Sequence, residues 1–119
     1  MNAIKVSVII PTYNDWGPLR ICLDALSVQT LPQDRFEIII ANNEDRFPPP
    51  PDFAMPQNAK MITVPQHGSY AARNGALDLA EGDIIAFTDA DCVPEPQWLT
   101  VAIDTFEADP SISAARQTR

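Results

Sequence analysis

The chain of 119 residues has the length of one ordinary domain, which excludes two full-sized domains. Hydrophobic residues make up 45% of the chain and charged residues 20%, a composition that supports a buried core and excludes a disordered protein. Eight Lys and Arg residues stand against sixteen Asp and Glu, a formal net charge of -8, which argues against a protein that binds nucleic acid through a basic face.

Short apolar runs alternate along the chain with stretches of helical period. The expected strands are Lys5 to Ile10, Phe36 to Ala41, Met61 to Val64 and Asp83 to Thr88. The expected helices are Asp15 to Gln29, Ser69 to Ala80 and Gln97 to Glu107. The residues predicted to face the core from the first helix are Leu19, Cys22, Leu23 and Leu26. Asn42 to Asn58 contains the proline run, and it is expected to be a surface connection.

This order of elements predicts an α/β domain, a Rossmann-like parallel sheet with helices on both faces. In such sheets ligands bind beyond the carboxyl ends of the strands, where the strand order reverses. Three segments follow strands at that edge: Pro11 to Asn14, Ala41 to Asn43 and Thr88 to Asp91. We therefore expect the functional site to be assembled from them.

Two features of the sequence indicate the cellular compartment. Cys22 and Cys92 are too few and too far apart for a disulfide framework or a zinc site, so a reducing compartment is expected. The apolar run Val6 to Ile10 is halted by Pro11 and is too short for a signal-peptide core or a membrane span. These features predict a cytoplasmic protein. A peripheral association of a longer protein with a membrane is compatible with them.

Asp89 and Asp91 form the most informative motif, because they follow an apolar strand. If strand geometry continues through them, both carboxylates lie on one face with Cα atoms about 6–7 Å apart. Two such carboxylates suit a hard divalent cation, Mn²⁺ or Mg²⁺, which also binds substrate phosphates. The plainer interpretation is a solvated acidic turn, since an isolated Asp-x-Asp is a weak motif.

Arg73 lies in the expected small-residue helix. Ala72, Ala76 and Leu79 recur there at helical spacing and are expected to pack on the sheet, while Ala71 and Gly75 permit a close approach. Arg73 then points elsewhere, and its planar guanidinium suits a diphosphate or a carboxylate. A structural ion pair with one of the acids that follow it is the alternative.

The segments after the first two expected strands carry aromatic and amide side chains. Pro11-Thr12-Tyr13-Asn14 has no Gly-rich loop, which argues against a dinucleotide fingerprint and a P-loop. Tyr13 can stack on a base, or it can cover the edge of the sheet. Asn42 and Asn43 can hydrogen-bond a base edge, or they can serve an ordinary turn.

Taken together, these motifs resemble the N-terminal half of a family 2 glycosyltransferase with the GT-A fold. The matching segments, which keep the family's order and spacing, are Val6 to Asn14, Ala71 to Asn74 and Gly82 to Asp91. The resemblance implies binding of a nucleotide diphosphate sugar, with a UDP-sugar favoured, and transfer of the sugar to an acceptor with inversion. The residues it assigns to the nucleotide sugar are Pro11, Thr12, Tyr13, Asn14, Asn42, Asn43, Arg73, Asp89 and Ala90.

The resemblance also implies individual roles. Pro11 and Tyr13 would hold the base, Arg73 would lie near the base or the phosphates, and Asp89 would meet the ribose. Asp91, with Asp89 beside it, would bind Mn²⁺ or Mg²⁺ on the diphosphate, and the metal would stabilise the departing diphosphate.

The chain departs from the family pattern in two ways. Asn42 and Asn43 stand where the family usually has acids, which leaves the identity of the base open. The family's general base belongs to a C-terminal, acceptor-binding half that would lie beyond Arg119. We therefore expect residues 1–119 to be a single nucleotide-sugar-binding domain that is inactive alone.

Three other protein classes are alternatives to a glycosyltransferase. A haloacid-dehalogenase-like phosphatase also uses Asp-x-Asp, but usually after its first strand rather than its fourth. A nucleotidyltransferase would normally have a Gly-rich first loop, which is absent here. A non-catalytic nucleotide-binding or scaffold module remains an alternative.

Overall fold

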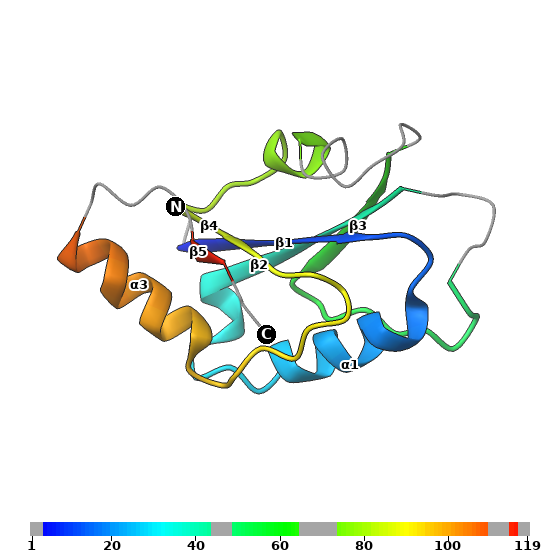
Figure 1. The fold of residues 1–119 in the computed structure, drawn as a ribbon, viewed down its shortest axis with the longest axis horizontal. Helices are drawn as coiled ribbons and strands as arrows, with labels where there is room; N and C mark the ends of the chain where they lie inside the picture. Colours follow the sequence, from blue (N-terminus) through cyan, green and yellow to red (C-terminus); the bar gives the residue numbers. More distant parts are fainter. Residues whose placement is uncertain (1–3, 44–48, 65–73, 110–114, 117–119) are drawn as a thin grey trace.

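The fold is a parallel sheet with helices on both faces, seen in a computed structural model that describes residues 4–43, 49–64, 74–109 and 115–116 (Figure 1). The strands are β1 (Val6–Thr12), β2 (Phe36–Asn42), β3 (Ala59–Thr63), β4 (Ile84–Phe87) and β5 (Ala115–Arg116). The helices are α1 (Trp16–Leu26), the 3-10 turn η1 (Gln33–Arg35) and α3 (Trp98–Ala108), with a further helical turn at residues 74–77. No helix among these residues is long and apolar enough to cross a membrane.

The strand order is β3-β2-β1-β4-β5, and each neighbouring pair is parallel. The chain starts in the middle with β1, adds β2 and β3 on one side, and then crosses to the other side for β4 and β5. The order therefore reverses between β1 and β4, the position at which open α/β sheets bind ligands. The predicted parallel sheet is confirmed, and the two-residue β5 is an addition that the sequence did not predict.

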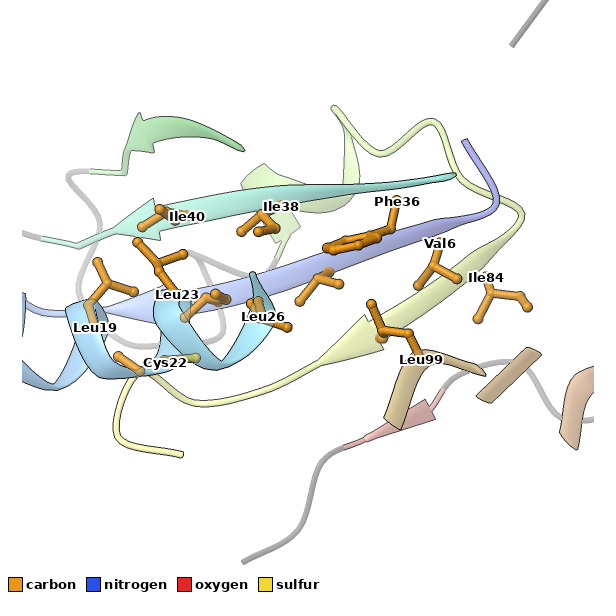
Figure 2. Packing of buried hydrophobic residues seen from close by; sticks show 14 residues of the cluster. Val6, Leu19, Cys22, Leu23, Leu26, Phe36, Ile38, Ile40, Ile84 and Leu99 are labelled. Carbon is orange, nitrogen blue, oxygen red and sulfur yellow. The ribbon is translucent and has the colours of Figure 1, made fainter. Parts of the chain in front are cut away.

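The larger core cluster lies between the sheet and the helices α1 and α3. The four residues predicted to face inward from α1 are all buried, each 0 or 1% exposed: Leu19, Cys22, Leu23 and Leu26. In Figure 2 Leu19, Leu23 and Leu26 lie beside Ile38 and Ile40, while Val6 lies near Ile84 and Leu99. Alternation along each strand places these strand residues on one face of the sheet, which α1 and α3 cover.

The opposite face carries a smaller cluster formed by Ile9, Ile39, Ala41 and Ala76. Ala76 belongs to the helical turn at residues 74–77, so this face is also covered by helix. A Cβ added to Gly75 would lie 3.1 Å from the Val64 side chain, which agrees with the close approach expected there. Leu79 was wrongly predicted to pack on the sheet: the helix ends at residue 77, and Leu79 is 38% exposed.

The proline-rich connection between β2 and β3 is anchored to the core at two points. Phe53 and Met55 are half-buried and pack against the larger cluster. A turn closed by the hydrogen bond from Phe53 N–H to the Pro50 carbonyl oxygen, 2.9 Å, precedes them. Residues 49–58, the described part of the connection, lie at the surface as predicted, but the side chains of Phe53 and Met55 pack inward.

Candidate functional site

The site is built at the carboxyl ends of β1, β2 and β4, around the reversal of strand order. In both figures the segment that follows β4 runs alongside α1, the helix that follows β1. Two strand ends that are far apart in sequence are thereby brought to one edge of the sheet. The predicted residues Arg73, Ala71 and Ala72 lie outside the described residues.

β1 continues through Pro11 to Thr12, whereas the strand was predicted to end at Ile10. Its pairing with β2 extends to Thr12↔Asn42, but its pairing with β4 stops at Ile9↔Phe87. The carbonyl of Ile9 accepts a hydrogen bond from Thr88 N–H on the β4 side, and that of Thr12 accepts one from Asn43 N–H on the β2 side. Pro11, two residues after Ile9, therefore faces the β4 side where the ladder has ended, so its missing N–H costs no hydrogen bond.

Thr12 is the last residue of β1, and it is only 5% exposed. Its hydroxyl oxygen is buried and has no hydrogen-bond partner in the part of the chain that the structure describes. A buried hydroxyl without a partner is unusual, because desolvating it costs free energy that a hydrogen bond would offset. Within the described part of the chain, the Thr12 hydroxyl is therefore free to hydrogen-bond a ligand or a water.

Tyr13 and Asn14, together with Asp15, form the short loop between β1 and α1. Tyr13 is 50% exposed, so its ring reaches solvent at this edge. Asn14 adopts a left-handed conformation with φ 58°, which asparagine tolerates better than most residues. The loop thus presents an aromatic side chain next to a residue whose left-handed backbone must be stabilised by other contacts.

Asn42 and Asn43 are buried at the end of β2, 3% and 7% exposed. The Asn42 Oδ1 accepts a hydrogen bond of 3.1 Å from Asn14 N–H, and the Asn43 Nδ2 donates one of 3.4 Å to the Val64 carbonyl oxygen. Each amide therefore has a protein partner that joins β2 to a neighbouring segment. Their predicted contacts with a base stay a prediction.

Asp89 and Asp91 lie in a turn rather than in a continued strand. β4 ends at Phe87, and Cys92 N–H donates to the Asp89 carbonyl oxygen at 3.1 Å, which closes a four-residue turn. The expected strand geometry is therefore wrong here, but the side chains still converge: ligand atoms of Asp89, Asp91 and Cys92 lie within 4.8 Å of one another. The side chain of Ala90, 4% exposed, belongs to the core cluster, which leaves only its backbone for a ligand.

The donor atoms of this turn fit a divalent cation. Two carboxylates supply the hard oxygen ligands that Mn²⁺ and Mg²⁺ prefer. The ligand atoms of the turn lie within 4.8 Å of one another, close enough for both carboxylates to reach one ion. Asp89 and Asp91 could therefore hold one ion together, with the remaining positions left for phosphate oxygens and water.

Cys22 of α1 lies beneath this acidic turn. Burial, followed by the neighbouring Cys92, Asp91 and Asp89, raises the pKa of the Cys22 thiol from 9.0 to about 12. Both cysteines are free and buried. Cys22 is therefore an uncharged core residue at neutral pH, and the interpretation of Cys92 as a small buried residue agrees with its 4% exposure.

A hollow of about 430 Å³ opens beside the start of α1, and sequence reasoning missed it. Its lining residues are Trp16, Gly17, Arg20, Pro50, Asp52, Phe53 and Ala54. The rings of Trp16 and Phe53 meet edge to face at 5.5 Å, and the Arg20 guanidinium carbon stands 4.5 Å from the centre of the Phe53 ring. Arg20 also donates to the Ala54 carbonyl oxygen, so its guanidinium binds the proline-rich connection to α1. The only signal in the sequence is an aromatic residue inside a proline-rich segment.

Comparisons with known proteins agree on one family. The family model described as "Glycosyl transferase family 2" matches residues 7–119. Glycosyltransferase AglE of Haloferax volcanii is 36% identical over 106 residues, which are 85% of this chain and 35% of that protein. Putative glycosyltransferase EpsH of Bacillus subtilis is 35% identical over 103 residues, 82% of this chain and 29% of that protein. The chain thus spans about a third of the length of these relatives.

Solved structures give the same result for the fold. Staphylococcus aureus TarS 1-349 in complex with UDP matches with a TM-score of 0.73 and 25% identity over 88% of this chain and 32% of that one. The mannosyltransferase PcManGT from Pyrobaculum calidifontis, in complex with GDP-Man and Mn²⁺, matches with a TM-score of 0.75 and 29% identity over 91% of this chain and 33% of that one. The fold is therefore of the predicted GT-A type. The chain belongs to glycosyl transferase family 2.

Proposed function

We propose that this chain binds the nucleotide diphosphate sugar donor of an inverting, metal-assisted glycosyltransferase. The observation that carries the proposal is the convergence of Asp89 and Asp91 in one turn at the reversal of strand order. A diphosphate is held by positive charge or by backbone amides. Because the chain carries a net charge of -8, we expect a bound cation to supply this positive charge. The carboxylates are the groups that would recruit this cation.

The remaining roles follow from the side chains at the same edge. The Tyr13 ring, 50% exposed, would stack on the base, and the buried Thr12 hydroxyl would gain the hydrogen-bond partner that it lacks among the described residues. Asp89 would accept hydrogen bonds from the ribose, and Asp91 would bind Mn²⁺ or Mg²⁺ on the diphosphate. Arg73, which lies outside the described residues, is assigned by the resemblance alone, and it would contact the base or the phosphates through its guanidinium.

Transfer of the sugar requires that the negative charge on the leaving diphosphate be stabilised. When bound, the cation would neutralise the negative charge that builds up as the bond from the sugar to the diphosphate breaks. Asp91 would fix the position of the diphosphate, and Tyr13 would fix the base at the other end of the nucleotide. The sugar would thereby be held in one orientation for attack by an acceptor hydroxyl.

The proposal also covers the base of the nucleotide and the question whether residues 1–119 are active alone. We favour a UDP-sugar, while solved relatives carry UDP in one case and GDP-Man in another. Since the matched region is about a third of the length of the relatives, we propose that residues 1–119 bind the donor as one domain and do not transfer the sugar alone. The general base would then come from outside this chain.

Calorimetric titration of UDP, GDP and dTDP, with Mn²⁺, with Mg²⁺ and with a chelator, tests the proposal. We expect metal-dependent binding of at least one nucleotide, with UDP the tightest. UMP is the matched control, because it lacks the second phosphate and should bind more weakly. If a chain shown by circular dichroism to be folded binds none of them in the presence of metal, the proposal is wrong.

A further inference from the structure

The loop after β1 depends on a single side chain from β2. Asn14 holds a left-handed backbone, φ 58°, which costs a non-glycine residue free energy unless the surroundings fix it. Its N–H donates to Asn42 Oδ1 at 3.1 Å, and its own Oδ1 accepts from Asn42 Nδ2 at 3.5 Å. Both ends of the Asn42 amide are thus directed at Asn14.

Asn42 is itself held rigidly. It is 3% exposed, it pairs with Thr12 in the sheet, and its carbonyl oxygen accepts a 2.7 Å hydrogen bond from Val64 N–H. The N–H of the next residue, Asn43, donates to the Thr12 carbonyl oxygen at 2.9 Å. A side chain locked in this way can impose its geometry on a neighbouring loop.

Tyr13 stands between the two residues that this arrangement fixes. Thr12 before it belongs to the sheet, and Asn14 after it is bound to Asn42, so the backbone of Tyr13 has little freedom. We infer that Asn42 is a positioning residue, which acts on the nucleotide by holding the Tyr13 ring at the edge of the sheet and does not itself read the base. The inference rests on the proposed function, in which Tyr13 stacks on the base.

Two substitutions separate positioning from base reading. Asn42→Ala removes both hydrogen bonds to Asn14, so it should loosen the loop. Asn42→Asp keeps an oxygen that accepts from Asn14 N–H, and the Asn14 amide can turn to donate to the new carboxylate. Positioning therefore survives in Asn42→Asp, whereas a base-reading role predicts a changed ratio of UDP to GDP affinity, because a carboxylate can only accept from a base while an amide also donates.

The experiment is a double-mutant cycle with Tyr13→Ala, read as the Kd of UDP and of GDP in the presence of Mn²⁺. Asn42→Ala should weaken the binding of UDP about tenfold in the native background. It should weaken binding less than about twofold in the Tyr13→Ala background, because the ring that it positions is gone. Asn42→Asp should keep the affinity within a few-fold, and the ratio of the two Kd values should stay constant in every variant.

Ser7→Ala is the matched control, because it breaks a buried hydrogen bond at the opposite end of the sheet. It should lower thermal stability without changing the Kd of either nucleotide. If Asn42→Ala does not fold, Asn14→Gly replaces it: glycine accepts the left-handed backbone but frees the loop, so the affinity should fall several-fold with the same UDP to GDP ratio.

Three results would overturn the inference. Additive effects of Tyr13→Ala and Asn42→Ala would show that Asn42 does not act through the ring. A changed UDP to GDP ratio in Asn42→Asp would show that Asn42 reads the base. The absence of nucleotide binding by the native chain would overturn the proposed function, and the inference with it, so the two failures are distinguished.

Discussion

The carboxylate of Glu37 accepts a hydrogen bond of 2.5 Å from the hydroxyl of Ser7, across the neighbouring strands β2 and β1. The same Oε2 atom accepts from Glu81 N–H at 2.7 Å, while Lys60 Nζ lies 3.4 Å from Oε1. Gly82 N–H then donates to the Ser7 hydroxyl oxygen at 2.8 Å. Glu37 and Ser7 therefore fasten the start of β4 to the middle of the sheet, at the edge opposite the functional site.

Glu37→Gln should lower the free energy of unfolding by about 1–3 kcal/mol, because the amide is a weaker acceptor for the buried Ser7 hydroxyl and the part-buried Glu81 N–H. Urea denaturation measures this change. Lys60→Met is the control: it removes only the ion pair, whose lysine side chain is 43% exposed, and it should cost less than about 1 kcal/mol. Equal losses in the two variants would assign the stabilisation to the ion pair.

Gly82→Ala should also destabilise the fold, for a steric reason. A Cβ at this position would lie 2.7 Å from Ser7 N and from the Val6 carbonyl carbon, both backbone atoms that cannot move aside. We expect a loss of at least about 1–3 kcal/mol in thermal or urea denaturation. A methyl added to Gly17 in α1 would meet no other described part of the chain within 4 Å apart from its own helix backbone and chain neighbours, so Gly17→Ala should be neutral or stabilise by about 0.5–1 kcal/mol. A neutral Gly82→Ala would contradict the close approach of the two segments.

The pKa of Cys22 predicts a loss of stability in alkaline solution. Burial is the main reason that this thiol has a pKa of about 12 when folded instead of 9.0. Above pH 9 the unfolded chain releases the proton and the folded chain keeps it, so the free energy of unfolding should fall by up to about 1.4 kcal/mol per pH unit until pH 12.

Urea denaturation from about pH 8 to 10.5, with a chelator present, tests this pH dependence. Cys22→Ala should be less stable at the lower pH because of the cavity, and its stability should fall less steeply. The difference between native chain and variant should therefore shrink as the pH rises. Parallel curves would show that Cys22 does not keep its proton in the folded state.

The sequence predicted the sheet and α1 well because burial alone determines them. Leu19 to Leu26 follow the helical period, and β1 and β2 are continuous apolar runs that are buried along their whole length, so local pattern and tertiary packing agree. The end of β1 could not be predicted in the same way. Whether Pro11 breaks the strand depends on where β4 ends, and that is a property of the assembled sheet.

The sequence predicted at which edge of the sheet the candidate residues lie, but not how their side chains are arranged there. The structure brings Asp89 and Asp91 together at the edge where the sequence placed them, but through a turn that no alternation rule contains, and their role stays a prediction. The amide of Asn42 has its partner in Asn14, 28 residues earlier, and Phe53 has its partners in α1. Such contacts are set by packing between segments distant in sequence, which a linear pattern does not encode.

Asp91→Ala should abolish metal-dependent nucleotide binding, because it removes one of two carboxylates whose ligand atoms lie within 4.8 Å in the turn after β4. Calorimetric titration of UDP with Mn²⁺ measures the effect, and we expect affinity to fall at least about tenfold, to the level seen with a chelator. Asp83→Ala is the control, since Asp83 is an exposed acid at the other end of β4 whose partner is Lys5 at 3.7 Å. It removes the same charge from the chain and should leave the Kd unchanged. An equal loss in both variants would mean that net charge, and not a bound cation, governs affinity, whereas an unchanged Kd in Asp91→Ala would mean that this carboxylate is not a ligand.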